Sequence, residues 1–307
     1  MMKKQKLFIL GLGSMTGSKL AKLAKPQFEI IGTYNTRIEP NNSFENFQLD
    51  ICNHKKVKDI IISQDPDCII NTTALNNVDY CEKNPELANK INYLAVKNIA
   101  EICNDQNIKL IHLSTDSVFD GQQSLSYEET DQPNPINVYG KSKYLGELEV
   151  SKNQNNLIVR ASVLYGWLPD NFASQSTSSM KQYNFGLWLI NTLKNNEIIK
   201  IITDELSTPI IADDFAQSIL HLIHKNKSGI FHSSPNIVIS RYEFSKKFAR
   251  SLSLNDELIL PTNNKELGRS VNTSLNKCLN SSKLNATGFK FLNLEESFEL
   301  IKNQMNS

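Results

Sequence analysis

A tyrosine and a lysine four residues apart, Tyr139 and Lys143, have the spacing in this sequence that best suits proton transfer. On a helix this spacing puts both side chains on one face, one turn apart. A nearby ammonium favours phenolate and lowers the pKa of a phenol from its usual value of about 10. The pair is therefore predicted to serve as a proton donor. Because Tyr-x-x-x-Lys is also common on solvated helix faces, the surrounding segments must decide between the two interpretations.

The segment before this pair supplies a second polar group. Residues 110–113 are an apolar run that predicts a buried strand, and the run leads directly into Ser114-Thr115-Asp116. Thr115 at the end of that strand is expected to hold a carbonyl oxygen against the phenol of Tyr139. Together the three side chains predict catalysis on a carbonyl group.

Short apolar runs alternate with helical patterns through the first half of the chain. Strands are predicted over residues 7–10, 28–33, 68–71, 110–113 and 157–160. Helices are predicted over residues 18–23, 54–63, 85–104 and 142–151. This alternation predicts an α/β fold with a doubly wound parallel sheet, whose ligands bind outside the carboxyl ends of the strands. Asn92, inside the third helix, is expected to be exposed or to anchor a water molecule near the site.

A glycine-rich turn follows the first predicted strand. Its sequence, Gly11-Leu12-Gly13-Ser14-Met15-Thr16-Gly17, reads as G-x-x-G-x-x-G with Ser14 in the second glycine position. Such a turn lets the backbone approach a pyrophosphate, which then lies at a helix N-terminus. The predicted cofactor contacts here are Gly11, Gly13, Ser14, Met15, Thr16 and Gly17.

The end of the second strand bears on the choice of cofactor. Residues 32–37 contain no acidic side chain to bind a ribose 2′-hydroxyl, but they include Asn35 and Arg37. An arginine can pair with a 2′-phosphate, which favours NADP over NAD. The alternative is that Arg37 is a solvated loop residue.

Two further strand ends carry candidate cofactor contacts. Asp50, next to Ile51, is predicted to accept a hydrogen bond from an adenine amino group, although a helix-capping or loop role explains an acid there equally well. Thr72, Thr73 and Ala74 end the fourth strand with small residues, as a backbone beside a cofactor ribose requires. These five residues complete the predicted dinucleotide site.

The second half of the chain has a different pattern. Residues 1–166 are predicted to form a dinucleotide-binding domain, to which residues 205–226 return, and residues 167–307 a smaller, mixed α/β substrate-binding domain. Helices are expected over 184–193, 213–224, 241–252 and 292–304, and strands over 198–203 and 229–232. Residues 167–183 are rich in Ser, Asn and Gln, which predicts an exposed or mobile insertion.

Composition excludes several classes of protein. The 307 residues include 33 Lys and Arg against 32 Asp and Glu, a net charge of +1 with no basic cluster, so no nucleic-acid partner is expected. No apolar stretch approaches membrane-spanning length, and residues 7–10 predict a first strand rather than a signal peptide. The 5 cysteines lack metal-type spacing. Reduced thiols in a cytoplasmic protein without a metal site are therefore expected.

Taken together, the motifs resemble the extended short-chain dehydrogenase/reductase superfamily, and within it the dTDP-4-dehydrorhamnose reductase family. Residues 114–121 read S-T-D-S-V-F-D-G where the family has S-T-D-Y-V-F-D-G, and residues 127–131 and 135–143 read Y-E-E-T-D and P-I-N-V-Y-G-K-S-K. Looser matches lie at residues 71–92, 159–162, 184–185, 204–209 and 229–232. The resemblance covers nearly the whole chain and implies a Rossmann-type sheet.

The resemblance also implies a reaction. Tyr139 would be the general acid, Lys143 would lower its pKa and bind the nicotinamide ribose, and Thr115 would hydrogen-bond the substrate carbonyl. The implied activity is reduction of the C4 carbonyl of a nucleotide-linked 4-keto-6-deoxy sugar by NADPH, with NADH as the alternative cofactor, in a monomer or homodimer. Two donors placed where negative charge develops stabilise the transition state more than the ground state.

Departures from the family pattern fall in the parts that contact substrate. Ser117 stands where the family usually has Tyr, and Val163 where it often has Trp; Trp167 or Tyr165 is expected to take over stacking on a base. Glu205 replaces a glutamine. The predicted substrate contacts are Ser117, Val118, Phe119, Val163 and Asn184. The reaction type is thus better specified than the sugar.

Two other functions stay open. One is a nucleotide-sugar epimerase or dehydratase with tightly bound NAD, although Ser117 beside Asp116 supplies no second acid for dehydration. The other is a non-catalytic subunit resembling the regulatory subunit of methionine adenosyltransferase, since a fold does not fix a function. Retention of Tyr139 and Lys143 argues against the second.

Overall fold

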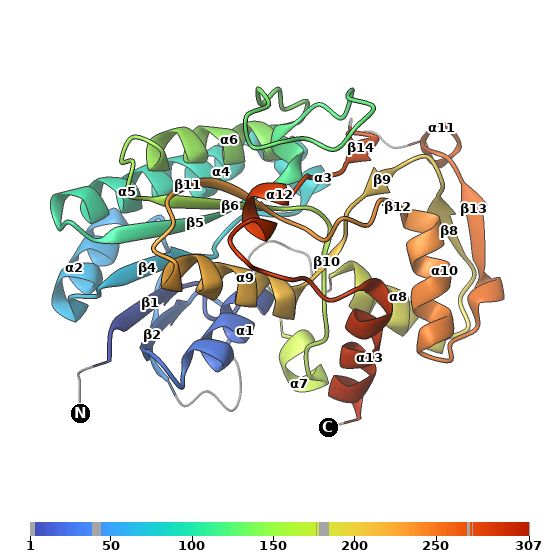
Figure 1. The fold of residues 1–307 in the computed structure, drawn as a ribbon, viewed down its shortest axis with the longest axis horizontal. Coiled ribbons are helices and arrows are strands. Elements are labelled where there is room, and N and C mark those ends of the chain that lie inside the picture. Colours follow the sequence, from blue (N-terminus) through green and yellow to red (C-terminus); the bar gives the residue numbers. More distant parts are fainter. Residues whose placement is uncertain are drawn as a thin grey trace.

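The computed structural model of the protein describes residues 4–38, 44–175, 177, 184–268, 271 and 273–306. Its centre is a seven-stranded sheet with the order β11-β6-β5-β4-β1-β2-β3 (Figure 1). All neighbouring strands in it are parallel. The strands are β1 (Lys6–Leu10), β2 (Glu29–Tyr34), β3 (Glu45–Gln48), β4 (Cys68–Asn71), β5 (Lys109–Thr115), β6 (Leu157–Ala161) and β11 (Gly229–Ser233). The predicted doubly wound α/β fold is confirmed, and its switch point lies between β1 and β4.

The helices form a layer on each face of the sheet. On one face lie α2 (His54–Gln64), α5 (Ala95–Asp105) and α6 (Val138–Val150), and on the other α1 (Met15–Ala24) and α9 (Ala212–His224) (Figure 1). Each layer closes over its own apolar core, the first built around residues such as Val57 and Ile99 and the second around Leu20 and Ile219. No helix in the described part of the chain is both long and apolar enough to cross a membrane.

The central sheet includes a strand, β11, that comes later in the chain than the predicted returning segment. Residues 205–226 were expected to be the part that returns to the first domain, yet β11 pairs with β6 in the register Phe231 to Val159. The central sheet therefore also includes residues 229–233. The sequence did not indicate this pairing, because an apolar strand pattern does not name its neighbour.

The helix predicted over residues 85–104 is interrupted. It consists of α4 (Pro85–Asn89), a π-helical turn (Lys90–Leu94) and α5, and a short α3 (Val78–Lys83) precedes it. The π turn directs Asn92 inward, where it is fully buried. Its amide accepts from Leu75 N at 2.8 Å and donates to Leu75 O at 3.1 Å and Ser142 Oγ at 3.0 Å. Asn92 is therefore not exposed, and it ties the loop after β4 to α6.

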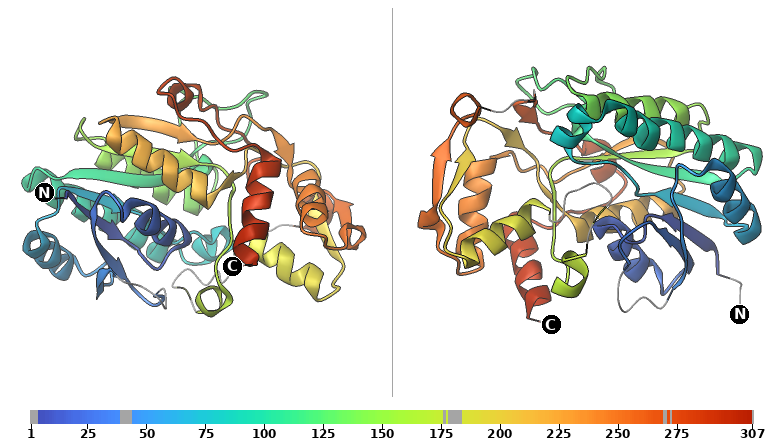
Figure 2. Two further views of the ribbon diagram at one scale, coloured as in Figure 1. Left: turned by 60° about the horizontal axis from the view of Figure 1, so that its bottom comes forward. Right: turned by 180° about the vertical axis from the view of Figure 1, so that it is seen from behind.

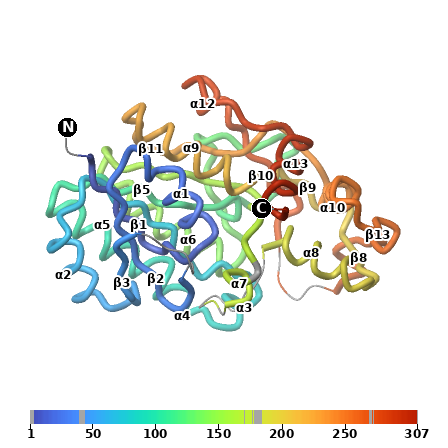
Figure 3. Tube along the Cα trace, turned by 90° about the horizontal axis from the view of Figure 1, so that it is seen from below, coloured from blue at the N-terminus to red at the C-terminus, as the bar shows by residue number. Residues whose placement is uncertain are grey.

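A second group of elements lies beside the sheet (Figures 1, 2 and 3). Its helices are α8 (Phe185–Lys194), α10 (Arg241–Ser251), α11 (Asn264–Leu267) and α13 (Leu294–Met305), whereas Leu284 of α12 (Ser282–Asn285) packs into the core of the central sheet. Its short strands form the pairs β8 (Ile199–Ile202) with β13 (Ile259–Thr262) and β7 (Leu164–Tyr165) with β10 (Ile210–Ile211), and a three-stranded sheet of β12 (Ile239–Ser240), β9 (Leu206–Ser207) and β14 (Asn276–Lys277). Phe244, Phe248 and Phe298 form the centre of a separate apolar core here. The division into two domains at residue 166 stays a prediction.

The predicted insertion at residues 167–183 is partly wrong. Leu168 and Phe172 are buried, and Phe172 belongs to α7 (Asp170–Ala173). Both pack with Leu187 of α8, so hydrophobic contact holds this stretch against the second group. Residues 176 and 178–183 of the prediction lie outside the described residues.

Candidate active site

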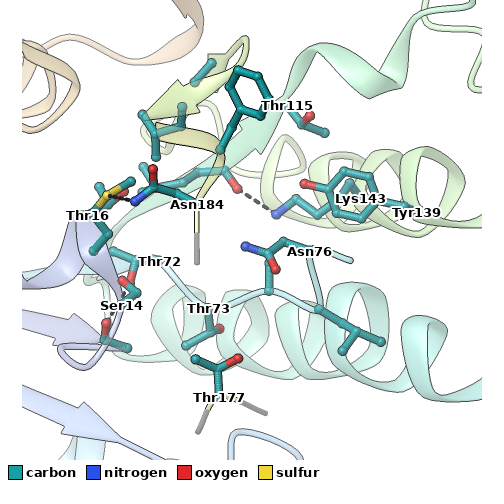
Figure 4. A pocket seen from close by; sticks show the side chains of 18 of the residues that line it. Ser14, Thr16, Thr72, Thr73, Asn76, Thr115, Tyr139, Lys143, Thr177 and Asn184 are labelled. Atoms are coloured by element: carbon teal, nitrogen blue, oxygen red, sulfur yellow. Dashed lines mark hydrogen bonds between the residues drawn. The ribbon is translucent and has the colours of Figure 1, made fainter. Parts of the chain in front are cut away.

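A cavity of about 1010 Å³ lies at the carboxyl ends of the central strands. The glycine turn after β1, the residues after β2, β4 and β5, and side chains of the second group all line it. The three catalytic candidates meet in this cavity. Figure 4 shows Tyr139 beside Lys143 on α6, with Thr115 at the neighbouring end of β5. The predicted convergence of a phenol, an amine and a threonine hydroxyl is thus present in the structure.

Close contact between α6 and the end of β5 brings these groups together. Asn137 caps the helix by accepting a hydrogen bond from Gly140 N at 2.9 Å. A Cβ at Gly140 would lie 2.0 Å from Ser117 O, so any larger residue would push the first turn away from the strand end. The cap and the glycine therefore position Tyr139, one residue before Gly140, against Thr115.

The environment of Tyr139 keeps the phenol protonated. Burial raises the pKa of the phenol, a hydrogen bond with Thr115 lowers it, and the nearby Asp116 and Cys81 raise it again. The expected lowering of this pKa by Lys143 is not found in this structure. A phenol that is protonated at neutral pH is a proton donor ready for use.

Lys143 is held by strand β5 rather than by Tyr139. Its Nζ donates to Leu113 O at 2.6 Å and lies 3.1 Å from His112 Nε2, and its side chain is almost fully buried. Burial lowers the pKa of Lys143 to about 8, against the opposing effect of Glu147. At this pKa the charge of Lys143 is sensitive to what binds beside it.

The glycine turn has the geometry expected of a phosphate-binding loop. Gly11 has a φ of +93°, and a Cβ there would lie 2.7 Å from Thr72 Oγ1, so the turn requires glycine at this position. Ser14 has a φ of −82° and caps α1 by accepting from Gly17 N at 2.9 Å. A side chain that caps the helix explains why serine can replace the second motif glycine.

Side chains beyond the turn complete a site that fits a dinucleotide. Met15 and Thr16 at the start of α1 line the cavity, no acid stands in the first helical turn, and Thr72, Thr73 and Ala74 face it from the end of β4. Asn35, Asp50 and Ile51 line its far end. Asp50 also accepts from Cys52 N at 2.9 Å, as an ordinary loop acid does. The helix N-terminus and the bare backbone suit a pyrophosphate.

Arg37 belongs to the wall of the cavity and is not a solvated loop residue. It is buried, its Nε donates to Gly13 O at 2.8 Å, and its guanidinium lies 4.7 Å from the centre of the Phe172 ring. Burial lowers its pKa. Arg37 Nε is thus bonded to the glycine turn, and the residue lines the cavity.

Three predicted contacts lie outside the cavity. A Cβ at Gly17 would come within 2.3 Å of Gly11 O, so this glycine allows close packing of α1 behind the turn. Val118 and Phe119, predicted to touch substrate, are buried in a small core with Tyr127 and Leu279, and Phe119 stacks on Tyr127 with ring centres 4.2 Å apart. Gly17 is thus needed for packing rather than for contact, and Val118 and Phe119 are not in the cavity because position in a motif does not fix which way a side chain points.

The substrate side keeps Ser117, Val163 and Asn184 as cavity-lining residues. Asn184 caps α8 and donates from Nδ2 to Gly166 O at 3.0 Å. Trp167 and Tyr165 do not take the place of the missing aromatic residues, since neither lines the cavity; Tyr165 is buried with its hydroxyl 2.6 Å from Ser297 Oγ. Ser117 and Val163, the two residues that differ from the family pattern, therefore line the cavity.

Sequence reasoning missed four residues on the same wall. Phe185 and Trp188 of α8 supply its aromatic surface, and Arg241 and Lys277 supply two cations. Both cations pair with the buried carboxylate of Glu205, Lys277 at 2.8 Å and Arg241 at 3.2 Å. The glutamate that replaces the motif glutamine was the available signal, but the cations that neutralise it come from distant segments.

Comparison with known proteins agrees with this geometry. The family model of the RmlD substrate binding domain matches residues 5–306. A probable low-salt glycan biosynthesis reductase of Haloferax volcanii is 32% identical over 277 residues, 90% of this chain and 89% of that protein. A dTDP-4-dehydrorhamnose reductase of Aggregatibacter actinomycetemcomitans is 30% identical over 249 residues, 78% of this chain and 76% of that protein.

Solved structures give the same result. The crystal structure of dTDP-4-dehydrorhamnose reductase from Bacillus anthracis in complex with NADP superposes with a TM-score of 0.85 at 28% identity, over 98% of this chain and 99% of that one. UDP-glucose 4-epimerase of Thermus thermophilus in complex with NAD, at 16% identity and a TM-score of 0.83 over 99% of both chains, shares the fold alone. The chain therefore belongs to the RmlD substrate binding domain family and is a dTDP-4-dehydrorhamnose reductase-like, NAD(P)-dependent oxidoreductase of the extended short-chain dehydrogenase/reductase superfamily.

Proposed function

We propose that the protein uses NADPH to reduce the C4 carbonyl of a nucleotide-linked 4-keto-6-deoxy sugar. The observation that carries the proposal is the meeting of Thr115, Tyr139 and Lys143 in the cavity that the glycine turn also lines. The names of the dTDP-4-dehydrorhamnose reductases among its relatives support the substrate class, and the NADP complex of the Bacillus anthracis enzyme supports the cofactor. Arg37 supports NADPH over NADH through its charge beside the cavity.

The residues of the cavity divide the work of carbonyl reduction. A reduced nicotinamide, when bound, supplies the hydride. Tyr139 Oη gives its proton to the carbonyl oxygen as negative charge develops there. Thr115 Oγ1, which donates to Asp116 at 3.0 Å in this structure, turns its hydrogen towards the same oxygen. Two donors at one developing charge lower the barrier more than they tighten ground-state binding.

The wall of the second group suits the nucleotide part of such a substrate. Arg241 and Lys277 present positive charge to a diphosphate, and Phe185 and Trp188 offer flat apolar surfaces to a base. Arg241 itself lies 4.7 Å from the centre of the Phe185 ring, which combines the two features at one point. A monomer or a homodimer is the expected assembly.

An assay of NADPH oxidation tests the proposal. Purified protein is mixed with NADPH and a panel of dTDP-linked 4-keto-6-deoxy sugars, and NADPH absorbance is followed together with the sugar product. We expect turnover with at least one sugar and its loss in Tyr139→Phe. Absence of NADPH oxidation with every sugar over the neutral and mildly alkaline range would refute the function. Tightly bound NAD in the purified protein would support an epimerase instead.

A further inference from the structure

His112 is a buried titratable residue with no part in the proposed reaction. It lies on β5, its side chain is fully buried, and it separates Asn71 on β4 from Lys143 on α6. Its Nδ1 is 3.2 Å from Asn71 Nδ2, and its Nε2 is 3.1 Å from Lys143 Nζ. The imidazole therefore connects the end of β4 to the amine beside the catalytic phenol.

The orientation of the Asn71 amide decides what His112 Nδ1 must do. Thr73 N donates to Asn71 Oδ1 at 3.0 Å, and Thr73 Oγ1 donates to the same oxygen at 2.5 Å. A backbone N–H can only donate, so the oxygen of the amide is the atom beside Thr73, and the NH₂ group faces the histidine. His112 Nδ1 must then accept a hydrogen bond.

A neutral imidazole has one donor and one acceptor nitrogen. Burial and the charge of Lys143 lower the pKa of His112 well below its ordinary value, so the ring is neutral. With Nδ1 accepting, the proton of His112 lies on Nε2 and points at Lys143 Nζ. An ammonium has no lone pair to receive it, whereas a neutral amine has one. The amine still donates one hydrogen to Leu113 O at 2.6 Å.

We propose that His112 fixes Lys143 in its uncharged form in the ligand-free protein at mildly alkaline pH, and that cofactor binding is accompanied by uptake of one proton at Lys143 Nζ. The second half rests on the proposed function, in which the nicotinamide ribose presents hydroxyl oxygens that accept from the ammonium. His112 is thus a positioning residue. Because a nearby ammonium favours phenolate, proton uptake at Lys143 lowers the pKa of Tyr139 and assists its proton transfer.

The charged groups around Lys143 are consistent with a neutral amine. Glu147 on the same helix favours the ammonium, but it forms a buried bidentate pair with Arg160 of β6. Arg160 Nε donates to Glu147 Oε1 at 2.9 Å, and Arg160 Nη2 donates to Glu147 Oε2 at 2.7 Å. Tyr139 of α6 and Asp116, directly after β5, line the same cavity as Lys143, and burial raises the pKa of both. Burial lowers the pKa of Lys143 to about 8.

The tautomer of His112 is measured directly by NMR on the wild-type protein without cofactor. Protein carrying ¹⁵N-labelled histidine is recorded through the couplings of the ring nitrogens to ring protons, and the His112 signals are identified by their loss in His112→Gln. We expect the neutral form with the proton on Nε2. The tautomer protonated on Nδ1, or an imidazolium, would overturn the proposal without any reference to activity.

Proton uptake is measured by calorimetry of NADPH binding in buffers with different ionisation enthalpies. At about pH 9, a lysine with a pKa near 8 in the free protein and an ordinary pKa in the complex takes up about 0.9 proton, whereas an ordinary lysine takes up less than about 0.1. Lys143→Met should bind NADPH with no such uptake. Wild-type binding without uptake would refute the recharging step.

Two variants test whether His112 itself controls the amine. In His112→Gln the side-chain oxygen can accept from the ammonium, so we expect the uptake at about pH 9 to fall to less than half its wild-type value. In His112→Phe burial still disfavours the ammonium but the Nε2–H that points at Nζ is gone, so we expect an uptake between those of wild type and His112→Gln. Equal uptake in wild type and His112→Gln would assign the effect to burial alone and overturn the role of His112. Neither measurement needs sugar turnover, so a lack of activity would refute only the proposed function.

Discussion

The sharpest test of the catalytic arrangement is the pair of substitutions Tyr139→Phe and Thr115→Val, made singly and together. Tyr139→Phe removes the proton donor and keeps the ring, and general acids typically contribute about 10²–10⁴-fold to the rate. Thr115→Val removes one hydrogen-bond donor at the developing oxyanion, which typically costs about 10²–10³-fold in kcat. In Thr115→Val, Asp116 Oδ1 still accepts a hydrogen bond from the Ser117 hydroxyl at 3.1 Å, so the carboxylate is not left without a donor.

The two effects should not multiply. The Thr115 hydroxyl hydrogen-bonds the Tyr139 phenol and opposes the rise of its pKa on burial, so each side chain depends on the other. Contacting residues of this kind couple by about 0.5–3 kcal/mol, and the double variant should therefore lose about 2–150-fold less activity than the product of the single losses.

Steady-state NADPH oxidation gives kcat and kcat/KM for each variant, and cofactor fluorescence gives the Kd for NADPH. Tyr165→Phe is the matched control, because its hydroxyl contacts Ser297 at 2.6 Å and lies outside the cavity lining. We expect kcat of the control to stay within about twofold of wild type and NADPH affinity to be kept in Thr115→Val. Full multiplicativity, or a loss under about threefold in Tyr139→Phe, would refute the shared-oxygen arrangement.

Three further outcomes follow from the structure. Arg37→Ala should raise the KM for NADPH by about 10–100-fold more than the KM for NADH, because the lost bond to Gly13 O affects both cofactors whereas only NADPH has a 2′-phosphate to pair with the guanidinium; equal effects in NADPH and NADH kinetics would contradict this. Asn92→Ala should lower the free energy of unfolding in urea by about 2–3 kcal/mol, since it leaves both polar groups of Leu75 without a partner, and a loss under about 1 kcal/mol would show that water replaces the amide. Burial raises the pKa of Asp214 to about 6, so its folded form prefers the proton: the stability this gives is full below the unfolded pKa of about 4 and is lost as pH rises through 6. Asp214→Asn, which can still accept from Leu292 N, should therefore raise the melting temperature at neutral pH but not at about pH 4, and a variant that is less stable at neutral pH would contradict the sign.

The local motifs of this protein are specified by short stretches of sequence. Strands β1, β4 and β6 were predicted within a residue or so because their runs are almost wholly apolar, as a strand buried on both faces requires. The glycine turn and the spacing of Tyr139 and Lys143 likewise depend only on neighbouring residues. Sequence by itself therefore determined most strands of the sheet, its ligand-binding edge and the Tyr139–Lys143 pair.

Tertiary structure alone decided which side chains share the cavity. Ser117 lines it while its neighbours Val118 and Phe119 are buried in a separate core, because consecutive side chains point in different directions and packing selects among them. Lys277 reaches Glu205 through the pairing of β14 with β9, a contact between segments far apart in the chain. The charge of an amine in such a place depends on burial and on partners from other strands, and no local pattern carries that information.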